Sequence, residues 1–251
     1  MVIREIKGRY RASLLGMLWF VLTPLFLITI YTIVFGVVFQ VRTPVRAAQS
    51  TGVAEFGIYL FSGLLVFTIF SDVISRSSSL IVENVNYVKK VVFPLEILPV
   101  VVLLTALAHG LAAFLALLGA MLIVLGSVPP TAVLFPFVIM MLLPMLLGFS
   151  WVLAGVGTYV RDLSQFIGMV LTCTMFLSPI FIPLANFPGE FQTLVLLNPV
   201  SVVVETGRTM LFDTTLMPLG ILATYLTLSC LVMFGGWVVF QKLRVGFADV
   251  L

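Results

Sequence analysis

Charged side chains are scarce in this sequence: they make up 9% of its 251 residues, against 61% for hydrophobic residues. Soluble domains carry about 25% charged residues, so this composition excludes an ordinary soluble protein and predicts an integral membrane protein. The net charge of +3 is too small to indicate nucleic-acid binding.

Cysteine and histidine are also nearly absent. Cys173 and Cys230 each lie inside an apolar run, where cysteine acts as a small hydrophobe. They have no CxxC spacing, so neither a metal site nor a disulfide framework is predicted. His109 is the single histidine and cannot form a catalytic triad or a metal site alone. We expect it to be a hydrogen-bonded structural residue, with a functional role inside the membrane as the alternative.

The sequence has no Gly-x-x-x-x-Gly-Lys-Ser/Thr motif, because none of its four lysines follows such a loop. This chain is therefore not expected to bind ATP through a P-loop, and no cofactor or catalytic residue is predicted for it. The near absence of charge within the long apolar runs argues against a proton- or ion-coupled pump. The first run is also too long for a cleavable signal peptide.

Long uncharged runs are what the sequence does contain. About 20 apolar residues suffice for a helix to cross a membrane. We predict an all-α integral membrane protein that forms one transmembrane domain over 1–251. Its six predicted spans are about 15–40, 56–76, 97–126, 132–160, 163–183 and 216–240.

Positive charge is distributed unequally between the two sides of the predicted membrane. With the N-terminus placed inside, ten of the 13 lysines and arginines fall in inside segments and three in outside segments. The inside group is Arg4, Lys7, Arg9, Arg11, Arg76, Lys89, Lys90, Arg161, Lys242 and Arg244. The outside group is Arg42, Arg46 and Arg208. Because cytoplasmic loops carry the excess of Lys and Arg, both termini are predicted to be cytoplasmic.

The first residues, 2–13, have the pattern of an amphipathic helix at the membrane interface. Apolar residues share one helical face, and Arg4, Lys7 and Arg11 share another, with Arg9 beside them. Such a helix lies flat with its apolar side in the membrane. The alternative is a simple basic anchor that holds the topology.

The stretch 83–93 lies between the second and third predicted spans. Val85, Val88 and Val91 have helical spacing, and Pro94 disfavours helix at the residue before it. We predict a short, rigid cytoplasmic helix that would move both adjoining spans if a force acted on it. An ordinary interfacial loop is the alternative.

The stretch 184–213, before the last span, is cut by prolines into apolar pieces that are too short to cross a membrane. Pieces of about 10–14 residues are typical of re-entrant or interfacial helices. We predict that this external segment dips into the membrane and acts as a gate there. The alternative is a pair of helices that lie flat on the surface.

Aromatic residues gather in the first and fifth predicted spans, with Tyr31, Phe35 and Phe39 four residues apart. Such a stripe commonly packs helices together, but aromatic faces can also carry stacked sugar rings. We predict that these two spans line a channel. The predicted lining is Tyr31, Phe35, Phe39, Phe166, Thr172, Phe176 and Ser178.

Motifs along the whole chain resemble, in order, the permease subunits of type-2 ABC exporters for polysaccharides, the O-antigen, capsule and teichoic-acid group. The matching stretches are Tyr10–Trp19 with Pro24 following, Asn84–Pro99, Arg161-Asp162, Ser178-Pro179-Ile180, Leu197-Asn198-Pro199 and Phe247-Ala248-Asp249. The chain departs from the family at Phe181 and Ile182, where an aromatic pair is common.

The resemblance implies a homodimer with a separate ATPase on each subunit, where ATP and Mg²⁺ bind. It also implies export of a lipid-linked polysaccharide across the bacterial inner membrane. With such a partner, we predict that the stretch 83–93 couples the chain to the ATPase through Asn84, Asn86, Tyr87, Val88, Lys89, Lys90, Val91, Phe93 and Pro94. In the external segment we predict the gate residues Pro188, Asn198, Pro199 and Arg208.

Other functions stay open at this point. An exporter of another lipid or glycolipid would share these features. A secondary transporter or channel would favour inverted repeats, and the halves 1–126 and 127–251 show no such correspondence. A membrane-embedded enzyme would need clustered His, Asp, Glu or Ser within its spans, which the sequence lacks.

Overall fold

The computed structural model describes residues 2, 5, 16–38, 53–88, 93–213 and 218–251. Throughout this part of the chain the regular structure is helical, and no strand occurs. The long helices are α3 (Val53–Ser77), α6 (Ile97–Leu125), α7 (Phe135–Tyr159) and α11 (Leu219–Arg244). The predicted all-α class is therefore confirmed.

Four helical stretches in the described residues are long and apolar enough to cross a membrane: Glu55–Ser77, Ile97–Leu125, Pro130–Tyr159 and Leu219–Arg244. A fifth candidate is the bent pair α9 (Gly189–Leu197) and α10 (Ser201–Arg208). The helical stretch Leu22–Phe35 and helix α8 (Leu163–Phe176) are apolar but shorter. These two shorter helices correspond to the first and fifth predicted spans. The count of six spans thus stays a prediction.

Helix α8 ends at Phe176, earlier than the boundary at 183 expected for the fifth span. The physical reason is Pro179, which disfavours a helical conformation at the residue before it. Helix α2 (Trp19–Tyr31) contains Pro24 and continues into a π-helical stretch, η2 (Thr32–Val38). The described part of the first predicted span therefore combines α-helical and π-helical geometry.

The turn between α6 and α7 is built from glycine and proline. Gly126 ends α6 with a φ of 69°, a left-handed conformation that glycine adopts without steric cost. Pro129 is extended, and Pro130 opens the 3₁₀ turn η3 (Pro130–Leu134) that leads into α7. The missing N–H of proline is tolerated at such a start.

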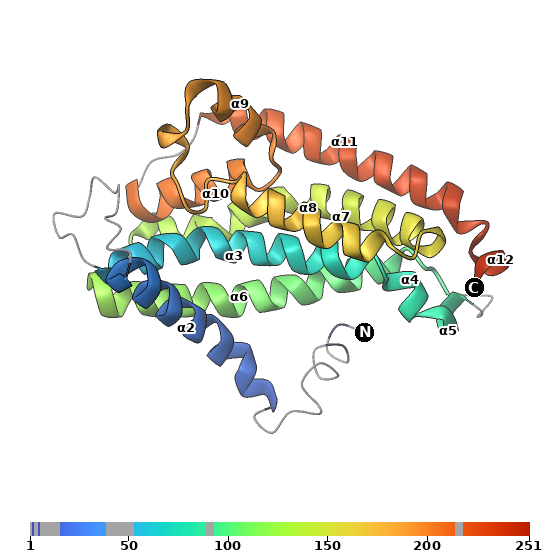
Figure 1. The fold of residues 1–251 in the computed structure, drawn as a ribbon, viewed down its shortest axis with the longest axis horizontal. Coiled ribbons are helices and arrows are strands. Elements are labelled where there is room, and N and C mark those ends of the chain that lie inside the picture. The colour runs from blue at the N-terminus through green and yellow to red at the C-terminus, as the bar shows by residue number, and fades with distance from the viewer. Residues whose placement is uncertain (1, 3–4, 6–15, 39–52, 89–92, 214–217) are drawn as a thin grey trace.

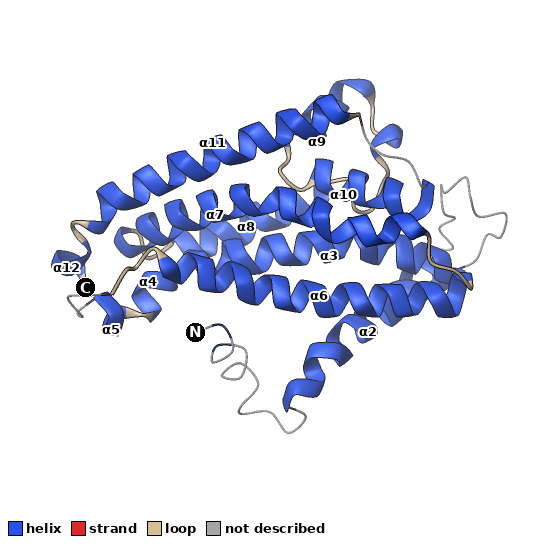
Figure 2. Cartoon of the chain, turned by 180° about the vertical axis from the view of Figure 1, so that it is seen from behind, coloured by secondary structure: helices blue, strands red, loops and turns tan. Residues whose placement is uncertain are grey.

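The long helices lie side by side along the long axis of the molecule (Figure 1). The short helices α4 (Leu80–Glu83), α5 (Val85–Val88) and α12 (Phe247–Val250) gather at one end with the C-terminus. Helices α9 and α10 lie toward the opposite end, and the view from behind shows the same separation (Figure 2). Each long helix therefore connects an end with α4, α5 and α12 to an end with α9 and α10.

Helix α3 lies at the centre of the bundle, packed against α6, α7 and α10, and most of its length is buried. Helix α11 lies at the edge and contacts mainly α7. A Cβ atom on Gly236 of α11 would overlap the carbonyl of Gly148 of α7, and one on Gly148 would overlap the carbonyl of Val232. Small residues at this crossing let the two backbones touch.

Candidate functional site

The predicted coupling segment lies at the end of the bundle that holds the C-terminus. The helix expected over 83–93 is interrupted in the structure, because Asn84 separates α4 from α5. The Asn84 side chain donates to the carbonyl of Leu80 at 2.9 Å, which satisfies the end of α4 and competes with a continuous helix. The described part of the segment, up to residue 88, therefore consists of the end of α4 and the short helix α5 with a break between them.

Other predicted coupling residues surround that break. Asn86 is exposed, and the ring of half-buried Tyr87 lies 4.6 Å from the ring of Phe93. Pro94 is exposed and precedes the turn into α6. Of the remaining coupling residues, Lys89, Lys90 and Val91 lie outside the described residues, and the side chain of Val88 is not described.

A cluster of buried hydrophobic residues anchors this segment to the bundle. Leu80 and Ile81 of α4 pack with Trp151 of α7 and with Phe240 of α11. A Cβ atom on Gly157 would overlap the carbonyl of Ser78, so α7 touches the backbone just before α4. Movement of α4 and α5 would therefore be transmitted directly to α7 and α11.

Glu96 joins the start of α6 to the end of α11. Its carboxylate accepts a hydrogen bond from Gln241 at 3.0 Å and pairs with Arg244. Trp151 also donates to the Glu96 backbone carbonyl at 3.2 Å. Burial alone would raise the pKa of Glu96, but the Gln241 hydrogen bond, a backbone hydrogen bond and the Arg244 charge outweigh it and lower the pKa.

Three of the aromatic residues expected in the channel, Tyr31, Phe35 and Phe176, meet in one cluster. The Phe35 ring lies 6.3 Å from Tyr31 and 6.0 Å from both Phe56 and Phe181. Phe181 lies 5.7 Å from Phe176, so the first and fifth predicted spans meet through this ring. These distances are typical of favourable aromatic pairs. Phe39 lies outside the described residues.

Three further residues of the predicted lining differ in exposure. Phe166 is exposed on α8, and so is Thr172, whose hydroxyl donates to the Gly168 carbonyl at 3.0 Å. Ser178 is buried and donates to the Met175 carbonyl at 2.7 Å. The Ser178 hydroxyl therefore satisfies a carbonyl at the end of α8 inside the core, and its place in the channel lining stays a prediction.

Helices α9 and α10 form the centre of the predicted gate and bend by 103° between them. Pro188 precedes α9, and Asn198 and Pro199 make the bend. The Asn198 side chain donates to the Thr174 carbonyl at 2.8 Å, and the Tyr225 hydroxyl donates to the Pro199 carbonyl at 2.7 Å. These bonds attach the bend to α8 and to α11.

Arg208, predicted as an external gate residue, is buried at the end of α10. Its guanidinium donates to the backbone carbonyls of Pro179, Ile180 and Tyr59. Gly63 of α3 leaves the space, since a Cβ atom there would lie 2.7 Å from an Arg208 nitrogen. Arg208 therefore fastens the predicted gate segment to the core, and its role in a gate stays a prediction.

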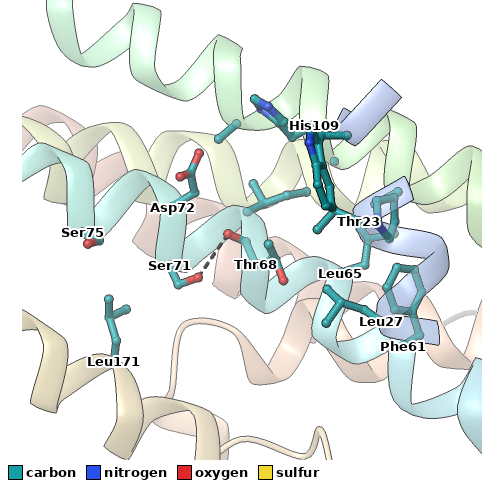
Figure 3. A pocket seen from close by; sticks show the side chains of 16 residues that line it. Thr23, Leu27, Phe61, Leu65, Thr68, Ser71, Asp72, Ser75, His109 and Leu171 are labelled. Carbon is teal, nitrogen blue, oxygen red and sulfur yellow. Dashed lines mark hydrogen bonds between the residues drawn. The ribbon is translucent and has the colours of Figure 1, made fainter. Parts of the chain in front are cut away.

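A groove of about 530 Å³ opens between α2, α3 and α6 and reaches Leu171 of α8 (Figure 3). Four polar side chains of α3 line it with helical spacing: Thr68, Ser71, Asp72 and Ser75. His109 of α6 faces the same groove, and its Nδ1 donates to the Thr105 carbonyl at 2.8 Å. The sequence argument did not select the α3 residues, although their i, i+3, i+4, i+7 spacing was a usable signal.

Other predictions for binding residues stay open. The membrane-interface residues Arg4, Lys7, Arg9 and Arg11 lie outside the described residues. Across the ranges that the structure describes, no group of three or more His, Cys, Asp or Glu side chains has the arrangement of metal ligands. Cys173 and Cys230 are both unpaired thiols on the exposed surface.

Comparison with known proteins gives a consistent result. A family model for ABC-2 type transporters matches residues 1–212. The chain is 28% identical, over 99% of its length, to 93% of the O-antigen export system permease protein RfbA of Myxococcus xanthus. It is 25% identical, over 99% of its length, to 92% of an RfbA of Klebsiella pneumoniae.

A third relative extends the range of substrates named among these proteins. The chain is 27% identical, over 82% of its length, to 77% of the polysialic acid transport protein KpsM of Escherichia coli. The family match covers most of the chain, and the three relatives are named as export permeases or a transport protein. The chain therefore belongs to the ABC-2 type transporter family, as a membrane permease.

Proposed function

We propose that this chain is the permease subunit of an ATP-driven exporter that moves a lipid-linked polysaccharide across the bacterial inner membrane. The observation that carries the proposal is the similarity, over 99% of the chain, to permeases named for O-antigen export. The membrane spans give the substrate a route. ATP and Mg²⁺ bind to a separate subunit, which hydrolyses the ATP.

The partner ATPase docks on the end of the bundle formed by α4, α5 and α12. The ABC-2 family implies such a partner, and this end presents Asn86 on an exposed turn. The cluster around Trp151 and Phe240 connects the turn to α7 and α11. In this arrangement the docking end, and with it both termini, lies in the cytoplasm.

Two copies of the chain form the channel around a two-fold axis along the membrane normal. A polysaccharide is wide, and a single bundle buries its own helix faces around α3 instead of enclosing a pore. Phe166, Met169 and Phe176 stay exposed on α8, where they can line the route or contact the second copy. The segment 184–213 closes the route on the external side.

The decisive experiment is transport by the purified complex. The chain is expressed with the ATPase that copurifies with it and reconstituted in proteoliposomes with lipid-linked polysaccharide. We expect ATP-dependent movement of the polymer across the bilayer, and a cross-linked species of two permease chains. Movement without ATP, or export of a lipid without a glycan by the same complex, would contradict the proposal.

A further inference from the structure

Between Phe56 and Ser78, helix α3 and the residue after it are exposed or half-buried only at polar side chains. Between Phe56 and Ser78 every residue is buried except five, and all five are polar. These five are Thr68, Ser71, Asp72, Ser75 and Arg76. The first four line the groove between α2, α3 and α6 (Figure 3).

A helix face that meets lipid should be apolar, because hydrocarbon offers no hydrogen-bond partner. Charged residues within membrane spans face the bundle interior or a water-filled cavity. The open face of α3 carries Asp72 and hydroxyls instead of the Leu and Phe side chains that the same helix buries. The Asp72 carboxylate on that open face favours a water-filled groove over contact with lipid.

Several polar atoms in the groove can accept hydrogen bonds. The Thr68 hydroxyl already donates to the Leu64 carbonyl at 2.7 Å, and the Ser71 hydroxyl donates to the Thr68 carbonyl at 3.2 Å. Their oxygen lone pairs, and the Asp72 carboxylate, can only accept. The groove thus offers acceptors to the hydroxyl groups of a ligand.

The charges beside the groove disfavour an anionic ligand. Arg76 lies one helical turn beyond Asp72, with 3.8 Å between Nη1 and the carboxylate, and pairs more closely with Glu5. A phosphate would meet the Asp72 carboxylate with repulsion. The ring of Trp19 and the apolar side chains of Phe61 and Leu27 supply flat walls for C–H groups.

We propose that this groove is a subsite for neutral sugar rings, in which Thr68, Ser71 and Asp72 accept hydrogen bonds from sugar hydroxyls. The inference rests on the proposed function in polysaccharide export and assigns part of the route to α3, which the aromatic pattern did not indicate. A volume of about 530 Å³ lies within the usual range for small-ligand sites, about 300–1,000 Å³. The groove lies in the half of α3 nearest α4, on the side where the ATPase docks.

Cysteine accessibility tests the site directly. In a chain with Cys173 and Cys230 replaced by Ala, Thr68→Cys and Ser75→Cys should react with a membrane-impermeant thiol reagent in the reconstituted complex. Thr227→Cys, on the exposed face of α11, is the matched control and should not react. Polysaccharide freed of its lipid by mild acid should protect positions 68 and 75. Protection by inorganic pyrophosphate or sodium chloride alone, or unreactive cysteines, would overturn the proposal.

Affinity and transport provide a second measurement. Asp72→Asn replaces charge-assisted hydrogen bonds with neutral ones and should weaken polysaccharide binding about tenfold. Thr68→Val should also weaken binding, whereas Thr227→Val should not, although both threonines donate to the carbonyl four residues back. Unchanged affinity in both groove variants, with normal wild-type transport, would refute the subsite. Absent transport by the wild-type complex would instead refute the proposed function.

Discussion

The guanidinium of Arg208 lies 3.9 Å from the centroid of the Tyr59 ring, although the two residues are 149 positions apart in the sequence. A cation over an aromatic face is attracted by the ring quadrupole, more strongly when both are shielded from water. Arg208 also donates to the Pro179 and Ile180 carbonyls, so it connects α10, α3 and the end of the fifth predicted span. The predicted gate segment is thereby held to the core by a buried charge.

Replacement of Arg208 by Ala should destabilise the protein by about 3 kcal/mol or more, because it leaves several buried carbonyls without donors. Arg208→Lys should recover part of this loss, since lysine keeps the charge but not the planar fork. The measurement is thermal unfolding of the purified protein in detergent. Arg161→Ala, at an exposed position, is the control. Equal unfolding temperatures for the Arg208 and Arg161 variants would show that the buried contacts contribute little.

Gly236→Ala should separate α11 from α7, because the added methyl overlaps the Gly148 carbonyl. Gly235→Ala is a closely matched control, since a Cβ atom at Gly235 meets nothing within 4 Å. Alanine is favoured over glycine in a helix by about 1 kcal/mol, so the control should be neutral or stabilising. The midpoints of denaturant-induced unfolding, followed by tryptophan fluorescence, should therefore shift in opposite directions. Equal shifts would refute the close crossing.

The pairing of Glu96 with Arg244 should depend on pH in a defined direction. The pKa of Glu96 is lowered in the folded protein from the ordinary value of 4.5. A lowered pKa contributes stability that is complete above the unfolded value and is lost as the pH falls through the folded value. The unfolding temperature of wild type should exceed that of Glu96→Gln above pH 4.5 and converge with it in stronger acid. A difference that grows on acidification would contradict the assignment.

Tyr87→Ala should weaken the coupling of ATP hydrolysis to export, because it removes the ring contact with Phe93 that holds α5 against the chain leading into α6. An aromatic pair contributes about 0.5–1.5 kcal/mol, so the polymer exported per ATP should fall by up to about tenfold. Val82→Ala, an exposed position on α4, should leave the ratio unchanged. A parallel loss of hydrolysis and export would point to failed docking instead.

The long spans could be predicted from the sequence because their signal is local. An uncharged run such as 97–126 identifies a membrane helix without knowledge of its neighbours. The aromatic stripes of the first and fifth predicted spans were visible too, and the rings of Phe35 and Phe181 do meet. A place for those rings in a channel depends on the assembly of two chains and stays a prediction.

The roles of Arg208 and Glu96 could not be predicted, because their partners are distant in sequence. Arg208 was counted as an outside charge, and its acceptors are backbone carbonyls, which leave no pattern in the sequence. Glu96 pairs with Arg244 across 148 positions. The interruption at Asn84 depends on a single side-chain hydrogen bond that competes with a favourable helical spacing.

The crossing of α7 and α11 also determines the order in which the molecule can be completed. A chain leaves the ribosome with its N-terminal part first. Helix α7 is therefore synthesised well before the helix whose backbone fills the space beside Gly148. Until α11 enters the bilayer, that side of α7 faces lipid or a chaperone. The last long helix thus completes the bundle, and a ribosome that stalls before residue 219 leaves a permease with an open side.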